Sequence, residues 1–330
     1  MDYDIAKGKY DFFMSVGSHC RPALYLRRYG LRTTSSPLDW MMGYRLETVE
    51  YLFRTSFEDF FQECTEIKEN NKLLKKEGHR WIEDTQNQIV SVHHFSTGLP
   101  LQEQRDKFYS KMKERYHRTS NLIREAKKVA LIGTWSDGFE VLEEFLKKFG
   151  ALYDKTAFTF INIRNNENID NMIVRDRIIS KNLKLIDYEF HDTTSESGIE
   201  AESSIQGWHT IMNSLWLIKQ PFIEKIRSTP PPEHLYVYGA GIYGLATIRL
   251  LLKYEIPVSA VLVTEPAGNP ENILGIPVID AHKLANDSSH CMAIIAVSDK
   301  CSNEKIKKKL EEKNMSIIIG FEETPFVYGN

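Results

Sequence analysis

The chain has 330 residues, of which 42% are hydrophobic and 26% are charged, and its formal net charge at pH 7 is -3. This length favours two domains, and the composition is that of a globular protein with enough apolar residues for buried cores. The near-neutral charge, with acidic and basic residues interspersed, argues against nucleic-acid binding.

The first predicted elements are a buried strand over residues 11–16 and a helix over residues 21–29, joined by a tight turn. The strand residues are apolar and β-prone, and Gly17 ends them. Pro22 falls in the first turn of the helix, where proline is tolerated, and Gly30 can adopt the left-handed conformation that ends a helix. The pattern therefore predicts a strand, a turn and a capped helix.

Cys20 lies in that turn, at the positive end of the helix dipole, between His19 and Arg21. These three influences favour a thiolate over a thiol, so the pattern predicts a cysteine presented as a nucleophile. A purely structural role is the alternative, because free cysteines are among the most buried residue types.

Helices and strands alternate along the rest of the first two thirds of the chain. The predicted helices lie near residues 45–54, 100–127, 139–149 and 208–226, and the predicted strands lie near residues 88–95, 128–135, 156–163 and 183–190. This alternation predicts a three-layer-like α/β domain, with a parallel or mixed sheet covered by helices. Active sites in such sheets gather at the carboxyl ends of strands, where we expect Cys20.

The loop over residues 31–41 follows the first helix and contains Asp39, next to Trp40. Two interpretations of Asp39 are open. An aspartate in a loop ordinarily caps the N-terminus of a helix. Asp39 can instead be the carboxylate that orients a catalytic imidazole.

A cysteine nucleophile needs a base, and histidine is the usual one. His93 and His94 end a predicted strand and face opposite sides of it, so at most one of them points at a given site. His209, near the start of the last predicted helix of the domain, is a rival to His93. His19 and His191 are further candidates. The spacing of these residues does not choose among them.

Three motifs stand close together near the N-terminus: Val16-Gly-Ser-His-Cys20-Arg-Pro-Ala, Leu26-Arg-Arg-Tyr-Gly-Leu-Arg32 and Ser36-Pro-Leu-Asp-Trp40. Together they resemble the signature of an uncharacterised bacterial family described as papain-like cysteine peptidases, whose members often occur among surface-polysaccharide genes. The resemblance extends over about residues 8–225, and the N-terminal motifs are its most specific part.

The resemblance implies that Cys20 is the nucleophile, His93 its base and Asp39 the carboxylate beside that base. The sequence departs from the family pattern at two places, one next to the proposed base and one that bears on the charge of the substrate. His94 stands where the family usually shows an acid, and Val129-Ala-Leu-Ile-Gly133 replaces a strand that commonly ends in arginine.

These three residues would support covalent catalysis by a thiol-dependent hydrolase or acyltransferase. His93 would withdraw the Cys20 proton, the thiolate would attack a carbonyl, and backbone amides of residues 17–21 would stabilise the oxyanion. Water or a sugar hydroxyl would then take the acyl group. The family context implies a role in the biosynthesis or modification of a surface polysaccharide such as a capsule.

Residues 229–233, Thr-Pro-Pro-Pro-Glu, can form neither a helix nor a central strand, and they predict a linker. We therefore expect one domain over residues 1–228 and a second domain over residues 234–330.

The second domain begins with a short predicted strand that ends at Tyr238. Gly239, Gly241 and Gly244 follow at once in G-x-G-x-x-G spacing and lead into an apolar helix. In this context the glycines permit the turn, the approach of a pyrophosphate and the close packing of helix on strand. Glu265, after the next predicted strand, stands where a carboxylate meets a ribose hydroxyl.

The second domain is thus expected to be a smaller Rossmann-like, doubly wound unit that holds a nucleotide, a nucleotide-sugar or NAD(P). It resembles modules attached to bacterial sugar acyltransferases and related sugar-modifying enzymes. A domain that has kept the fold and lost the ligand is the alternative. Two functions follow: a thiol enzyme acting on a small molecule or glycan precursor, or a non-catalytic nucleotide-sugar-binding or scaffold protein. A homo-oligomer is compatible with the sequence.

The four cysteines, Cys20, Cys64, Cys291 and Cys301, show no C-x-x-C spacing. They argue against a zinc cluster or a disulfide framework, and we expect no metal. The N-terminus lacks the pattern of a signal peptide, and no apolar run approaches the length that spans a bilayer. We therefore expect a cytoplasmic protein with reduced thiols.

Overall fold

The computed structural model describes residues 6–67, 78–193, 200–285 and 287–327. The chain divides into two compact units. The first unit comprises Met1–Leu26 and Thr34–Ile218, and the second comprises Arg27–Thr33 and Lys219–Asn330. This division falls before the proline-rich segment, so the helix between Ile218 and that segment belongs to the second unit.

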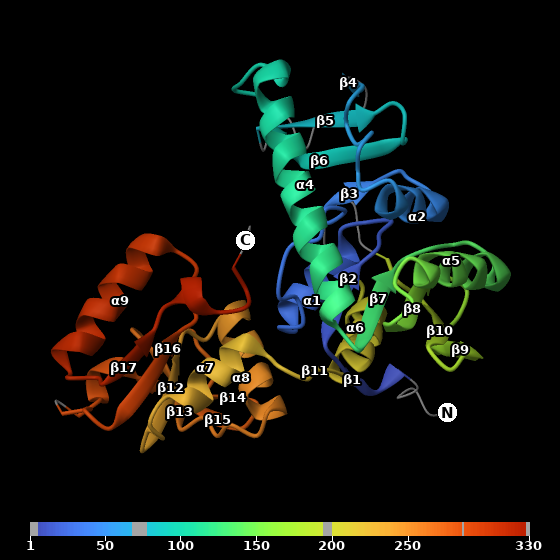
Figure 1. Cartoon of the computed structure of the whole chain (residues 1–330). Coiled ribbons are helices and arrows are strands. Elements are labelled where there is room, and N and C mark those ends of the chain that lie inside the picture. Colours follow the sequence, from blue (N-terminus) through green and yellow to red (C-terminus); the bar gives the residue numbers. More distant parts are fainter. Residues whose placement is uncertain (1–5, 68–77, 194–199, 286, 328–330) are drawn as a thin grey trace. The chain divides into compact units, whose positions relative to one another are not determined.

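The first unit contains most of α1 and all the elements from β1 to β11 (Figure 1). In chain order they are β1 (Gly8–Tyr10), β2 (Phe12–Ser15), α1 (Arg21–Arg28), β3 (Met41–Met42), α2 (Leu46–Arg54), β4 (Cys64–Glu66), β5 (His79–Asp84), β6 (Ile89–Ser96), α4 (Leu101–Glu125), β7 (Lys128–Gly133), α5 (Phe139–Ala151), β8 (Ala157–Asn165), β9 (Ile173–Ser180), β10 (Leu183–Phe190), α6 (Glu202–Asn213) and β11 (Leu215–Leu217).

The central sheet of the first unit has the strand order β2-β7-β8-β10-β9. The first four strands are parallel, and β9 pairs with β10 in the antiparallel direction. Alternate residues face opposite sides of a sheet. Leu131 and Phe160 join a core cluster with residues of α2, α4 and α5, while the alternate residues Ile132 and Ile161 are buried as well. Both faces of the mixed sheet are therefore covered, as the alternation of elements predicts.

The turn around α1 follows the sequence prediction closely. Pro22 is the second residue of the helix, and Gly30, just beyond its end, has φ of +65°. Gly30 therefore adopts the left-handed conformation that commonly ends a helix.

Three features of the first unit differ from the prediction. The single helix expected over residues 208–226 is wrong, because α6 ends at Asn213 and β11 follows and pairs with β1. The hairpin strand β9 was not predicted. A second, antiparallel sheet with the order β3-β6-β5-β4 also appears, of which only β6 was predicted.

The second unit contains one sheet with helices and short 3-10 turns. Its elements are α7 (Pro221–Ser228), β12 (His234–Tyr238), α8 (Ile242–Lys253), β13 (Ala260–Val263), β14 (Asn272–Ile273), β15 (Ile276–Asp280), η2 (Ala281–Lys283), β16 (Cys291–Ile295), α9 (Lys300–Glu312), β17 (Ile317–Ile319) and η3 (Phe321–Glu323). The strand order is β14-β15-β13-β12-β16-β17. All pairs are parallel except that of the short edge strand β14.

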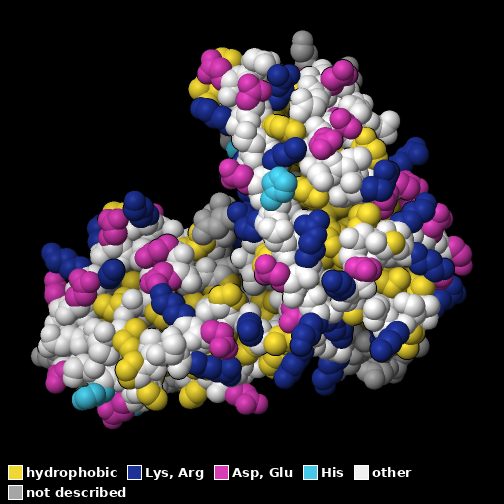
Figure 2. Space-filling view, viewed as in Figure 1, with side chains coloured by type: hydrophobic (Ala, Val, Ile, Leu, Met, Phe, Trp, Pro, Cys, Tyr) yellow, Lys and Arg dark blue, Asp and Glu magenta, His cyan; other side chains and the backbone are white. Residues whose placement is uncertain are grey.

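The surface carries both signs of charge. On the face drawn in Figure 2, Lys and Arg side chains are interspersed with Asp and Glu side chains. Within the part of the chain that the structure describes, no helix has both the length and the apolar composition needed to cross a membrane.

Candidate active site

Cys20 lies where the first strand of the central sheet gives way to a helix. β2 ends at Ser15, α1 begins at Arg21, and the carbonyl of Cys20 accepts a hydrogen bond from the amide of Leu24 at 3.0 Å. The residue is half-buried. The cysteine thus stands at the carboxyl end of a sheet strand and at the N-terminus of a helix, as the sequence predicts.

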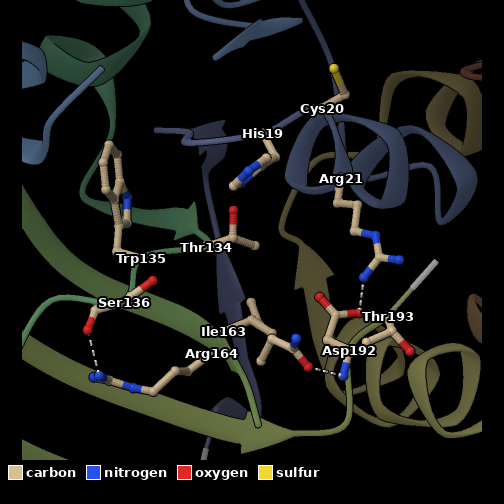
Figure 3. A pocket seen from close by; sticks show the side chains of 11 residues that line it. His19, Cys20, Arg21, Thr134, Trp135, Ser136, Ile163, Arg164, Asp192 and Thr193 are labelled. Carbon is tan, nitrogen blue, oxygen red and sulfur yellow. Dashed lines mark hydrogen bonds and ion pairs between the residues drawn. The ribbon is translucent and has the colours of Figure 1, made fainter. Parts of the chain in front are cut away.

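A cavity of about 540 Å³ opens at this edge of the sheet. Its lining residues follow or end the four parallel strands β2, β7, β8 and β10 (Figure 3). They are His19, Cys20, Arg21, Thr134, Trp135, Ser136, Ile163, Arg164, Asn165, Asp192 and Thr193. Ligand sites of open α/β sheets occupy this position, outside the carboxyl ends of the strands.

The thiol of Cys20 is protonated in the resting structure. Burial raises its pKa to about 11, and the negative charge of Asp39 acts in the same direction. The expectation that the helix dipole and the adjacent cations favour a thiolate is therefore wrong for this state. The physical reason is that desolvation and a nearby carboxylate both disfavour a second negative charge.

Asp39 is a buried carboxylate, with 2% of its surface exposed. It accepts hydrogen bonds from the hydroxyl of Ser15 and from the amide of Ser36, the latter at 3.0 Å. Because β3 follows at Met41, no helix begins at Asp39 and the N-cap interpretation is wrong. The Ser15 contact fixes the loop against the end of β2, close enough for the carboxylate charge to influence Cys20.

His93 and His94 have different surroundings on β6. The ring of His93 lies edge-on to the ring of Trp40, with 6.1 Å between centroids. His94 Nδ1 lies 3.0 Å from the hydroxyl oxygen of Ser91, and its ring packs against Phe108. Since Trp40 follows Asp39 directly, His93 lies beside the loop that carries Asp39.

Burial lowers the pKa of His94 to about 3, with further contributions from Arg115 and other nearby cations. A group this weakly basic remains neutral at physiological pH and is a poor proton acceptor. His94 is therefore unsuited to be the base.

The low pKa of His94 has a consequence for stability. As pH falls from about 6.5 towards about 3, the unfolded chain binds a proton that folded His94 excludes, so the free energy of unfolding should decrease. For one proton this slope is at most about 1.4 kcal/mol per pH unit. Urea unfolding at several pH values should show a shallower acid dependence for His94→Asn than for the wild type. The exposed control His117→Asn should keep the wild-type dependence; equal slopes in all three proteins would contradict the prediction.

The other histidines occupy separate places. His19 lines the cavity with Cys20, and its Nδ1 lies 3.0 Å from the hydroxyl oxygen of Ser18. Burial, with Arg21 in addition, lowers the pKa of His19, while Asp192 opposes this effect. His93, His191 and His209 are not among the residues that line the cavity.

Sequence reasoning missed Asp192, which anchors the turn around Cys20. Asp192 Oδ1 accepts hydrogen bonds from Arg21, from Ser204 at 2.6 Å and from the indole of Trp208 at 3.0 Å. These contacts join the start of α1 to the carboxyl end of β10 and to α6. Its position just after a predicted strand was the one available signal, since polar residues there lie at the edge that carries Cys20.

Gly17 and Tyr44 pack tightly beside the same turn. Gly17 has φ of +96°, and a Cβ there would collide with the Tyr44 hydroxyl. That hydroxyl is buried and has no hydrogen-bond partner among the described residues. Burial raises the pKa of Tyr44, as do the negative charge of Asp39 and that of Cys20 once its thiol ionises. Tyr44 therefore stays a neutral phenol close to the thiol.

In the second unit, the glycines have the geometry that their spacing predicts. Gly239 follows β12 with φ of +114°, and Gly241 is the N-cap of α8. A Cβ on Gly244 would collide with the carbonyl oxygen of Gly239, whereas a Cβ on Gly241 would meet nothing within 4 Å. Glu265 is exposed shortly after β13. Over the described residues no group of three or more His, Cys, Asp or Glu side chains could hold a metal ion.

Residues 11–164 match a family model described as "Putative papain-like cysteine peptidase (DUF1796)". The match includes Cys20, Asp39 and His93 and ends before Asp192. The matched part of the chain is thus like a papain-like cysteine peptidase, which indicates a thiol hydrolase. No curated protein and no solved structure matches the chain.

Proposed function

We propose that the first unit is a thiol-dependent hydrolase or acyltransferase in which Cys20 is the nucleophile, His93 the base and Asp39 the carboxylate that orients the base. The observation that carries the proposal is the position of Cys20, in the wall of a cavity of about 540 Å³ at the carboxyl ends of four parallel strands. The family match over residues 11–164 supports the same chemistry.

The raised pKa of Cys20 defines how such an enzyme must work. With a pKa of about 11, the thiol is almost entirely protonated at neutral pH, so a base must remove the proton as the sulfur attacks. His93 would take that proton while Sγ bonds to the substrate carbonyl carbon. Amides of the turn over residues 17–21 would stabilise the oxyanion. His93 would then protonate the leaving group, and water or a hydroxyl would release the acyl group from sulfur.

The placement of Asp39 and Trp40 supports the choice of His93. Asp39 is held by Ser15, and its charge acts on the thiol of Cys20, while the neighbouring Trp40 contacts His93. A carboxylate beside the imidazole would fix its tautomer and stabilise the imidazolium that forms.

Iodoacetamide labelling tests this assignment without a known substrate. Labelling of Cys20 should be at least about tenfold faster than that of Cys64 near neutral pH, because only Cys20 would have a base. His93→Gln should remove this neutral-pH reactivity. The labelling rate of Cys20 should then rise with pH only as the thiol ionises, with its pKa of about 11. His209→Gln, the matched rival, should behave as the wild type.

Mass spectrometry of each labelled peptide would give both rates from one sample. If His209→Gln and not His93→Gln removed the fast labelling, His209 would be the base. Equally slow labelling of Cys20 and Cys64 in the wild type would contradict a catalytic role for Cys20.

We propose that the second unit is a Rossmann-like domain that binds a nucleotide, a nucleotide-sugar or NAD(P). The parallel strands follow the order β15-β13-β12-β16-β17. Numbered along the chain, this is the order 3-2-1-4-5, which matches the first five strands of the classic dinucleotide-binding order 3-2-1-4-5-6. The open space at Gly241 at the start of α8 suits the approach of a phosphate. A cavity of about 600 Å³ lined by Ser298 and Phe321, which follow β16 and β17, supports a ligand at the same edge.

We propose further, from the family resemblance of the N-terminal motifs, an enzyme that acts on a precursor of a surface polysaccharide. We also propose that Gly239, Gly241, Gly244 and Glu265 hold a nucleotide in the second unit. The second candidate is a non-catalytic nucleotide-sugar-binding or scaffold protein of the same pathway, which the high pKa of Cys20 favours. Slow labelling of Cys20 combined with binding of UDP-glucose would support the second candidate.

A further inference from the structure

Asp192 presents one unused carboxylate oxygen to the cavity. Its Oδ1 accepts three hydrogen bonds, from Arg21, from Ser204 at 2.6 Å and from Trp208 at 3.0 Å. From the residues that the structure describes, Oδ2 accepts none, although the side chain is only 6% exposed. Unlike Arg21 Nη2, Oδ2 is not sealed from solvent. In Figure 3 it is directed away from Arg21, towards the side of the cavity on which Thr134 lies. Because both oxygens of an ionised carboxylate are acceptors, a ligand donor can bind Oδ2.

A chain of hydrogen bonds fixes the tautomer of His19, which lines the same cavity. The hydroxyl oxygen of Ser18 lies 2.9 Å from the carbonyl oxygen of Thr134 and 3.0 Å from His19 Nδ1. A carbonyl can only accept, so Ser18 donates its single proton to Thr134 and accepts a hydrogen bond from Nδ1. Desolvation lowers the pKa of His19, which keeps the imidazole neutral near pH 7. Nε2 therefore carries a lone pair and is an acceptor.

These two acceptors face the same part of the cavity. In Figure 3 the ring of His19 is directed towards Thr134 from one side, and Asp192 Oδ2 is directed towards Thr134 from the other. All three residues line the cavity. The hydroxyl of Thr134 donates to the carbonyl of Gly17 at 3.3 Å, so its oxygen is a further acceptor. This part of the cavity is therefore suited to a ligand that donates several hydrogen bonds.

The charges favour a neutral ligand. Arg21 pairs with Asp192, and Arg164 pairs with the buried carboxylate of Asp187, so the charges around the cavity balance. An ammonium group at Oδ2 would lie close to the guanidinium of Arg21, and an anion would be repelled by Asp192 itself. Hydroxyl groups donate without a charge. Carboxylates near the carboxyl ends of strands accept hydrogen bonds from sugar hydroxyls in dinucleotide-binding folds, and Asp192 has this position after β10.

We propose that the cavity binds a neutral sugar, whose hydroxyls donate hydrogen bonds to Asp192 Oδ2 and to His19 Nε2. Asn165 also lines the cavity, and its Oδ1 accepts from the amide of Asp192 at 2.8 Å, so its Nδ2 can donate to a sugar oxygen. The volume of about 540 Å³ is typical of small-molecule sites. The identification of this sugar as the acceptor of the acyl group rests on the proposed function, whereas the binding itself requires no reactive thiol.

Binding can be measured on the full-length protein by saturation-transfer difference NMR and calorimetry. The probes are the methyl glycosides of glucose, galactose, mannose and N-acetylglucosamine, which differ in the directions of their hydroxyls. At least one of them should bind in a saturable way. Glucosamine, which carries an ammonium group, and glucuronate, which carries a carboxylate, should both bind more weakly than that neutral sugar.

Substitutions locate the site. Asp192→Asn keeps the shape of the side chain and replaces Oδ2 by a donor, so the sugar affinity should fall by about tenfold or more. Asp84→Asn is the matched control, a buried carboxylate that does not line the cavity. His19→Phe keeps a ring and removes Nε2, so it should weaken binding by about three- to tenfold. His117→Phe, at an exposed position, should bind as the wild type. Gly241→Ala should also bind as the wild type, because it alters only the second unit.

Three results would overturn the proposal: no saturable binding of any of the four glycosides, tighter binding of a charged analogue than of every neutral sugar, or unchanged affinity in both Asp192→Asn and His19→Phe. Circular dichroism would verify folding, and His19→Phe decides the question if Asp192→Asn is unfolded. Sugar binding in a protein whose Cys20 labels slowly would leave the sugar site standing and reject the enzyme. Fast labelling without sugar binding would do the reverse.

Discussion

Asp39→Asn should change the labelling of Cys20 in opposite directions at neutral and at alkaline pH. The charge of Asp39 raises the pKa of the thiol, so its removal should lower that pKa and speed iodoacetamide labelling above about pH 9 by roughly tenfold. Near pH 7 the same variant should label more slowly, because His93 would lose the carboxylate that orients it. With p-nitrophenyl acetate as a generic acyl donor, acylation of Cys20 should fall by about 10² to 10⁴.

Asp84→Asn is the matched control for this experiment. Asp84 is another buried carboxylate of the first unit, which accepts a hydrogen bond from the amide of Phe61 at 2.7 Å. Its charge raises the pKa of Cys64, after burial as the larger cause and with Arg105 opposing. Asp84→Asn should therefore speed alkaline labelling of Cys64 and leave Cys20 unchanged.

The dependence of the Cys20 labelling rate on pH separates the two expected effects of Asp39, one on the pKa of the thiol and one on the orientation of His93. A uniform shift to lower pH, with no loss near neutrality, would mean that Asp39 acts on the thiol through its charge alone. An unchanged profile would mean that Asp39 influences neither Cys20 nor the base.

Gly244→Ala should lower the stability of the second unit, whereas Gly241→Ala should leave its stability nearly unchanged and weaken ligand binding. A Cβ on Gly244 would collide with the backbone carbonyl oxygen of Gly239, and backbone cannot rotate away as a side chain can. We expect α8 to be displaced from β12 and the unit to lose about 3 kcal/mol or more of stability. Gly241 has open space and φ of -79°, so alanine there should change the stability by less than about 1 kcal/mol.

Gly241→Ala should weaken ligand binding even though it leaves the fold stable. Its new methyl group would occupy the space through which a pyrophosphate approaches the start of α8, so the affinity for NAD⁺ or UDP-glucose should fall by about tenfold or more. Urea unfolding followed by calorimetry would give both quantities. Gly138→Ala serves as the control, since Gly138 is likewise an N-cap glycine, at the start of α5 in the first unit, with φ of -60° and only ordinary van der Waals contact for a Cβ. Full affinity in Gly241→Ala, where the wild type binds, would exclude a phosphate at this turn.

Some structural features are readable from a few neighbouring residues. The strand that leads to Cys20 is a short apolar run, and the end of α1 needs a residue that tolerates positive φ, which Gly30 supplies. The long charged helix α4 begins after Pro100, as its composition predicts. Local backbone preference determines each of these features, so the sequence predicts them well.

Other elements exist only because of distant partners. β5 spans His79–Asp84 and is rich in charged residues, so its composition does not predict a strand. It forms a strand because its backbone pairs with β4 and β6 and because Ile82 and Asp84 face inward. Likewise β11 interrupts the predicted helix because its backbone pairs with β1.

The protonation state of Cys20 also depends on residues that are distant in the sequence. Helix dipole and adjacent cations are visible in the sequence, but desolvation and the carboxylate of Asp39 outweigh them, and neither can be read from residues next to the cysteine. The contact between Arg21 and Asp192 joins residues that are 171 positions apart.

The sequence alone determined the strand, turn and helix that present Cys20 and the glycine pattern that starts α8, because backbone preferences act over a few residues. Tertiary structure alone decided the cavity, the partners of Arg21 and Asp39, and the pKa of the thiol. Those properties depend on burial and on charges that approach through space, which only the folded chain brings together.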